Sequence, residues 1–225
     1  MSFMSKFFGN TRKPEGFWGR MVVSGMNGGS HEKLAKWGLS HVWFLGGERV
    51  LDCGCGGGAN IARMLRLIPN GHVSGLDYSE VSVNKSREVN KKDIAAGRCE
   101  IVQGNVADIP FGDAQFDMVT AFETVYFWPD LIGSFQEVCR VLKQSGSFVI
   151  VNESNGRNEK SLKWTRIIDG MNVYTGEQLK TYLEDSGFAD IRIYDDDKND
   201  RITVQARKNK KEVEYPLPMQ EERDR

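Results

Sequence analysis

The pattern of apolar positions changes its period within residues 50–60, VLDCGCGGGAN. Before the glycines, residues 49–53 form a short apolar run that is typical of a buried strand. After them, apolar side chains recur at i, i+3, i+4 and i+7, one face of a helix made by Ile61, Met64, Leu65 and Ile68. The pattern therefore predicts a strand, a sharp turn and a helix that begins near Ala59.

The alternation of strand and helix continues along the chain. Further strands are predicted at residues 72–78, 99–105, 116–123 and 146–153. The intervening helices are bounded by a cap at Ser79 and a stop at Gly97, by Pro129 in a first turn, and by a capping box of Thr175 and Gln178 before a stop at Gly187. Alternating strands and helices indicate βαβ units and a mostly parallel sheet.

Apolar alternation on both sides of the polar turn DDDKND predicts a final hairpin, with inward positions at Ile191, Ile193, Ile202, Val204 and Ala206. The predicted fold class is thus α/β, a three-layer Rossmann-like sandwich. Its seven-stranded, mostly parallel sheet ends in a C-terminal antiparallel hairpin.

The regions outside the alternating core have a different composition. Residues 1–48 contain Trp18 and an apolar stripe at Leu34, Trp37, His41 and Leu45, which predicts a helix reached through a hinge at Gly28 and Gly29. This N-terminal segment is either a helical lid over a ligand or a cover for a sheet edge. The core domain is predicted at 49–207, with an insertion at 154–174, and residues 208–225 form a charged tail.

Composition excludes several classes of protein. The chain has 225 residues, enough for one α/β domain, and its 30 basic and 31 acidic residues give no global field that would attract nucleic acid or an anionic membrane. This balance does not exclude a local basic patch. Its four cysteines contain no CxxC pair, so reduced thiols are expected and no metal site is predicted. No apolar run is long enough for a membrane span, and no signal peptide is recognisable, which predicts a cytoplasmic protein.

The glycine turn has the chemistry of a ligand site. Gly54, Gly56 and Gly58 lack a Cβ, so a ligand can lie against the backbone, and the following helix directs unpaired N–H groups at it. Asp77 ends the second strand 21 residues after Gly56, the spacing at which a carboxylate accepts hydrogen bonds from ribose. An NAD-dependent dehydrogenase remains an alternative, because Gly54, Gly56 and Ala59 also satisfy GxGxxA.

Four motifs in order extend this signal: LDCGCGGG, GLDYS, QGNVADIPF and FDMVTAFETVYFWPD. With them, residues 49–207 resemble the class I S-adenosylmethionine-dependent methyltransferases, in the small-molecule group similar to quinone-biosynthesis methyltransferases. The resemblance implies that S-adenosylmethionine is the cofactor and S-adenosylhomocysteine the product. It also implies a cofactor site made of Asp52, Gly54, Gly56, Gly58, Asp77, Tyr78, Gly104, Asn105, Val106 and Phe122, with Asn105 standing where the family often has aspartate.

Methyl transfer from a sulfonium mainly requires alignment of the nucleophile and exclusion of water. Where the small-molecule acceptor must lose a proton, Glu123 is the first candidate base, followed by His31 and Tyr126. The alternative for Glu123 is a carboxylate that accepts backbone N–H groups, and the alternative for His31 is packing at a hinge. A non-catalytic module that binds S-adenosylmethionine is a further hypothesis.

Overall fold

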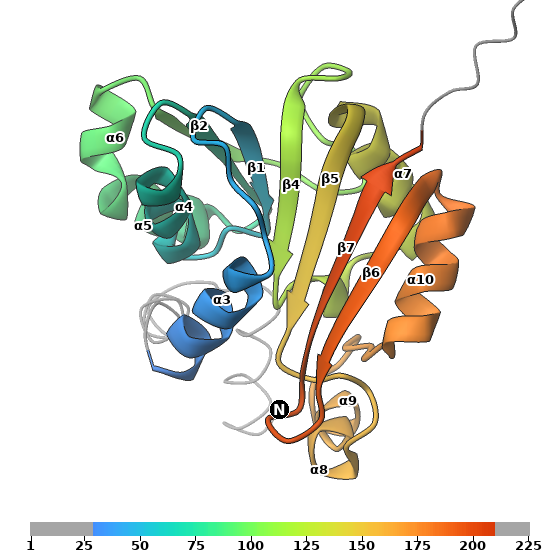
Figure 1. Cartoon of the computed structure of the whole chain (residues 1–225). Coiled ribbons are helices and arrows are strands. Elements are labelled where there is room, and N and C mark those ends of the chain that lie inside the picture. Colours follow the sequence, from blue (N-terminus) through green and yellow to red (C-terminus); the bar gives the residue numbers. More distant parts are fainter. Residues whose placement is uncertain (1–28, 210–225) are drawn as a thin grey trace, which may run out of the picture.

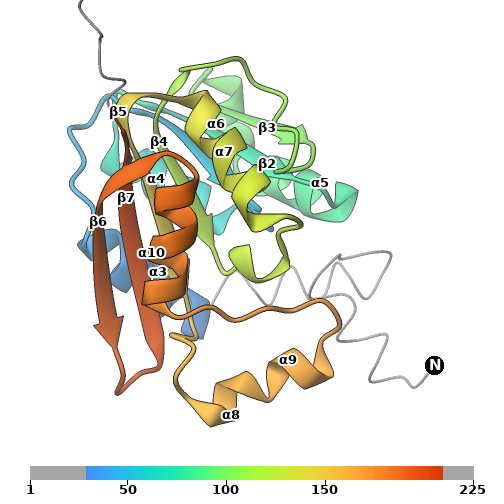
Figure 2. The same cartoon turned by 90° about the vertical axis from the view of Figure 1, so that its right-hand side faces the viewer.

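The computed structural model describes residues 29–209, which form a seven-stranded sheet between two layers of helices (Figures 1 and 2). The strand order is β3-β2-β1-β4-β5-β7-β6. The strands are β1 (Arg49–Cys53), β2 (His72–Asp77), β3 (Cys99–Gln103), β4 (Phe116–Phe122), β5 (Leu142–Asn152), β6 (Phe188–Asp196) and β7 (Arg201–Lys208). Strand β7 runs antiparallel to the other six strands, so the predicted mostly parallel sheet with a terminal hairpin is confirmed.

Each face of the sheet is covered by helices with an apolar side. On one face, α3 (Ser30–Ser40), α4 (Ala59–Leu67) and α5 (Glu80–Val89) pack on valines that include Val50, Val73 and Val151. On the other face, α7 (Leu131–Val141) and α10 (Gly176–Asp185) pack on Phe148 and Ile150. The side chains of strand residues alternate between these two cores, as expected for a doubly covered sheet.

The insertion between β5 and α10 carries two short helices, α8 (Glu159–Leu162) and α9 (Trp164–Ile167). They lie beyond the carboxyl ends of the parallel strands, at the bottom of both views (Figures 1 and 2). The short helix η1 (Val125–Phe127) follows β4 at the same end. This end also holds the glycine turn after β1.

Two predicted helix boundaries were wrong. The helix after Ser79 is broken at Asn90 into α5 and α6 (Lys91–Ala95), because the Asn90 amide donates to the carbonyls of Gly58 and Ser86. The helix α7 begins after Asp130, whose side chain caps Gly133, so Pro129 precedes the helix. The capping box of Thr175 and Gln178 is confirmed.

The prediction of one helix with an apolar stripe at Leu34, Trp37, His41 and Leu45 was partly wrong. The helix α3 ends at Ser40 with His41 as its C-cap, and Leu45 is 86% exposed in the following segment. Gly29 has a φ of 64° at the start of α3, consistent with a glycine-dependent change of direction. The rest of the predicted lid, including Trp18 and Gly28, and the tail beyond Asn209 lie outside the described residues.

Candidate active site

The glycine turn after β1 is tied to the end of β2. The N–H groups of Gly54 and Cys55 donate to the Leu76 carbonyl at 2.7 and 3.0 Å. All three predicted glycines have positive φ. An added Cβ would lie 2.4 Å from Thr124 at Gly54 and 2.4 Å from Ser86 at Gly58, but would meet nothing within 4 Å at Gly56. Packing therefore requires two of the glycines, while Gly56 presents open backbone to a ligand.

Asp77 lies directly beside this turn. Its carboxylate accepts from the N–H of Gly56 and from the N–H of Ser79, both at 2.9 Å. The side chain is 7% exposed, and this burial raises the pKa of the Asp77 carboxyl. The two positions separated by 21 residues in the sequence thus meet, and Asp77 holds the shape of the turn as well as offering carboxylate lone pairs there.

Asp52 is more deeply buried than the sequence suggests. It is 1% exposed, and its carboxylate accepts from the Thr120 hydroxyl at 2.8 Å. Burial raises the pKa of Asp52 to about 7, the Thr120 hydrogen bond opposes the rise, and the nearby Asp77 adds to it. Thr120 was missed because only the pairing of β1 with β4 places it opposite Asp52.

A cavity of about 50 Å³ lies over the turn. The helix α3 contributes His31, Leu34 and Ala35 to its lining, and the end of β4 contributes Phe122 and Glu123. The floor is the turn and the first residues of α4, Gly54, Cys55, Gly56, Gly57, Ala59 and Asn60. Leu34 belongs to the stripe of the predicted lid, whereas Ala35 and Asn60 were not predicted as site residues, because no local pattern distinguishes them.

Glu123 is held in an unusual conformation at the end of β4. Its φ is 61°, in the left-handed region that non-glycine residues rarely adopt. Its Oε1 atom accepts from the backbone N–H of Glu153 and, at 3.2 Å, from the Tyr126 hydroxyl. Burial, followed by the neighbouring Glu153 charge, raises the pKa of Glu123 to about 8.

Tyr126 belongs to the same network. Its hydroxyl accepts from the Ser154 N–H at 3.0 Å, and the side chain is 3% exposed. Burial and the Glu123 charge raise the pKa of Tyr126 well above its usual range. Glu123 and Tyr126 are therefore brought together, and His31 lines the same cavity as Glu123.

The other predicted cofactor residues lie at the ends of β2 and β3. The Gly104 N–H donates to the Asp77 carbonyl at 3.0 Å, and Asn105 Oδ1 accepts from the Ala107 N–H at 3.0 Å. Tyr78 is 40% exposed and Val106 is partly buried. Tyr78 follows Asp77 in the chain, whereas Gly104, Asn105 and Val106 are brought near it by the pairing of β2 with β3. None of the four residues lines the small cavity.

The residues present fit S-adenosylmethionine. The first N–H groups of α4 have no side-chain cap, because the N-cap is Gly58. An anionic group suits these donors, the open backbone at Gly56 allows close approach, and the buried carboxylate of Asp77 suits hydroxyl donors. Within residues 29–209, no group of three or more His, Cys, Asp and Glu side chains is placed to hold a metal ion.

A methyltransferase-domain family matches residues 45–210. A 24-methylenesterol C-methyltransferase 2 of Oryza sativa is 39% identical over 103 residues, 46% of this chain and 28% of the relative. A cycloartenol-C-24-methyltransferase 1 of the same organism is 32% identical over 151 residues, 63% of this chain and 44% of the relative. The chain thus spans less than half the length of these relatives.

Solved structures share the fold at low identity. A SAM-dependent methyltransferase from Aquifex aeolicus aligns with a TM-score of 0.70 and 20% identity, covering 84% of this chain and 98% of the other. A phosphoethanolamine N-methyltransferase 2 of Haemonchus contortus, in complex with S-adenosylhomocysteine, aligns with a TM-score of 0.73 and 16% identity, covering 94% of this chain and 61% of the other.

Among the described helices, none is long and apolar enough to cross a bilayer.

Proposed function

The chain belongs to the methyltransferase-domain family, and from this premise we propose that it binds S-adenosylmethionine at the turn between β1 and α4 and methylates a small molecule. The single observation that carries the proposal is the contact of Asp77 with Gly56 at 2.9 Å. It joins the acid of the second strand to a glycine of the turn whose Cβ position is open.

The dehydrogenase alternative is set aside by the family match and by the sheet. A dinucleotide-binding sheet has the order 3-2-1-4-5-6 with parallel strands. Here β7 is inserted antiparallel between β5 and β6. GxGxxA and the acid of β2 are therefore shared features that do not distinguish the two classes.

Bound S-adenosylmethionine supplies an electrophilic methyl group on a sulfonium. The chain's own task is to align an acceptor with that group and to exclude water. Leu34 and Ala35 of α3 and Phe122 of β4 give the cavity apolar walls. Sterols, named in the curated relatives, belong in the first panel of acceptors to test.

Glu123 is the proposed general base, with Tyr126 and His31 in supporting positions. Oε1 of Glu123 is already held by two donors, which orients the carboxyl group at the cavity wall. With a pKa of about 8, Glu123 is largely protonated at neutral pH and gains basic form as the pH rises. We expect kcat/KM to rise with pH up to about 8 and this rise to disappear in Glu123→Gln.

Calorimetry with S-adenosylmethionine, S-adenosylhomocysteine and NADH tests the cofactor. We expect binding of the first two and none of NADH. Turnover is then measured as S-adenosylhomocysteine formed with each acceptor of the panel. Binding of NADH alone would refute the proposal, whereas cofactor binding with no turnover on a broad panel would favour a non-catalytic binding module.

A further inference from the structure

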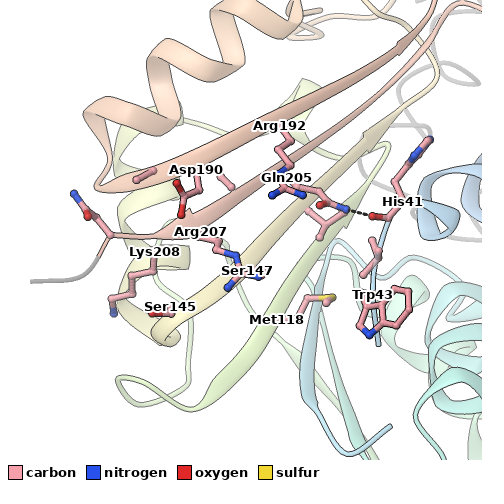
Figure 3. A pocket seen from close by; sticks show the side chains of 15 residues that line it. His41, Trp43, Met118, Ser145, Ser147, Asp190, Arg192, Gln205, Arg207 and Lys208 are labelled. Carbon is pink, nitrogen blue, oxygen red and sulfur yellow. Dashed lines mark hydrogen bonds between the residues drawn. The ribbon is translucent and has the colours of Figure 1, made fainter. Parts of the chain in front are cut away.

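A second and larger cavity, of about 810 Å³, lies on the sheet face that carries α3 (Figure 3). Met118 and Ser147 form part of its floor; Met118 lies in the first half of β4 and Ser147 at the middle of the parallel strand β5. The glycine turn follows the carboxyl end of β1, which is parallel to β4. The large cavity is therefore separate from the candidate active site and lies toward the opposite end of the sheet.

The polar part of this cavity is cationic. Arg192 of β6 and Arg207 of β7 line it with Lys208, while Asp190 is its one acidic lining residue. Within residues 29–209, neither arginine side chain makes an ion pair or hydrogen bond. Lys208 donates to the Leu142 carbonyl at 2.8 Å and keeps its other N–H groups. Two guanidinium groups are thus available to a ligand.

Strand register places the two arginines on one face. Arg192 lies opposite Gln205, and Arg207 is two residues further along the same strand, so the arginines are diagonal neighbours. Ser147 lies directly opposite Arg207 on β5 and adds a hydroxyl. Figure 3 shows both guanidinium groups and Ser147 within the same hollow.

The opposite wall is apolar and aromatic. Trp43, 85% exposed, and Val42 come from the segment that follows α3. This segment is held to the sheet because Gln205 Nε2 donates to the His41 carbonyl at 2.6 Å. The wall thus offers an indole surface beside the cationic floor (Figure 3).

We propose that this cavity binds the phosphoryl group of a second ligand. Guanidinium groups present paired donors that match phosphate oxygens, and hydroxyl and ammonium donors can satisfy the remaining oxygens. A volume of about 810 Å³ is within the usual range for small-molecule sites. The phosphoryl group belongs either to a free small molecule or to a lipid headgroup, which bind through the same chemistry.

The test uses the full chain and two probes. Inorganic pyrophosphate is titrated by calorimetry, and co-sedimentation is measured with phosphatidylcholine vesicles with and without phosphatidic acid. The variant Arg192→Gln/Arg207→Gln is compared with Arg66→Gln/Lys92→Gln, which removes the same charge from exposed positions outside both cavities. Thermal melts confirm that both variants are folded.

We expect pyrophosphate to bind the wild type and the control variant, and to bind the double arginine variant at least about tenfold more weakly. Binding to phosphatidic acid vesicles alone, with the same dependence on the two arginines, would identify a headgroup as the source. The proposal is overturned if neither probe binds the wild type, or if the double arginine variant binds as the wild type does.

Discussion

At the scale of single residues, the glycines of the turn differ in what they do. Gly54 and Gly58 are confined by neighbouring side chains, whereas Gly56 faces open space. From the sequence, all three look equivalent, because a Cβ clash depends on residues far along the chain such as Thr124. The distinction leads to different effects of the same substitution.

We predict that Gly54→Ala costs about 3 kcal/mol of unfolding free energy, since it combines strain at φ 77° with a Cβ 2.4 Å from Thr124. Gly56→Ala should cost only about 1 kcal/mol, from backbone strain, yet weaken S-adenosylhomocysteine binding at least about tenfold. Urea denaturation and calorimetry measure the two quantities. Equal stability losses in the two variants would show that the turn does not have this geometry.

Glu123 predicts a dependence of stability on pH. Its folded pKa, about 8, is raised above the ordinary 4.5, so its contribution to stability is present below about pH 4.5 and is lost as the pH rises toward 8. The substitution Glu123→Gln removes this loss of stability at high pH, because glutamine does not ionise. Its amide oxygen can still accept from the Glu153 N–H and the Tyr126 hydroxyl. We expect the variant's Tm to exceed that of the wild type by about 10 °C at pH 8, and by only about 2 °C at pH 5.

The control is Glu153→Gln, which removes the neighbouring charge that also raises the pKa of Glu123. It should shift the wild-type pH dependence of Tm to lower pH without abolishing it. A Tm difference between Glu123→Gln and wild type that is the same at pH 5 and pH 8 would exclude a raised pKa at Glu123.

At the scale of elements, α3 both covers the sheet and lines the small cavity, the two roles that the sequence left as alternatives. It packs on the sheet so closely that a Cβ at Gly38 would lie 2.6 Å from Val151. Its first turns also line the small cavity through His31, Leu34 and Ala35. Whether α3 moves as a lid remains a prediction, and it can be tested within the described part of the chain.

We predict that S-adenosylhomocysteine slows tryptic cleavage at Lys33 and Lys36, both exposed on α3, because a ligand under the helix must hold it in place. Cleavage fragments are followed by mass spectrometry. Lys91 and Lys92 on α6 are exposed but remote from the cavity, and their cleavage rate should not change. Ligand-independent cleavage at all four lysines would leave α3 as a cover of the sheet.

The elements that could be predicted from the sequence are those set by local signals. The apolar runs of β1 and β4, the period of α4 and the box at Thr175 correspond closely to the structure. The break at Asn90 could not be predicted, because its amide bonds to Gly58, 32 residues away. The pairs Asp52–Thr120 and Glu123–Glu153 likewise depend on tertiary pairing that no local pattern contains.

At the scale of the whole molecule, cofactor binding and stability are linked. A ligand that binds only the folded chain adds about 2.7 kcal/mol of stability at one hundred times its Kd. For a domain of this size, we expect S-adenosylhomocysteine to raise Tm by about 5 to 10 °C. Asp77→Asn should show a smaller rise at the same concentration, and differential scanning calorimetry measures both. No rise in the wild type would contradict binding at the turn.

The antiparallel placement of β7 has a consequence for how the chain is made. Strands β5 and β6 are both complete before β7, yet β7 lies between them and pairs with both. During synthesis on the ribosome, the edges of β5 and β6 that pair with β7 therefore stay unpaired until residues 201–208 have been made. Local folding of residues 49–152 can begin earlier, but the part of the sheet formed by β5, β7 and β6 is completed only when β7 emerges. This part of the sheet is therefore the one most exposed to chaperones and to mispairing during synthesis.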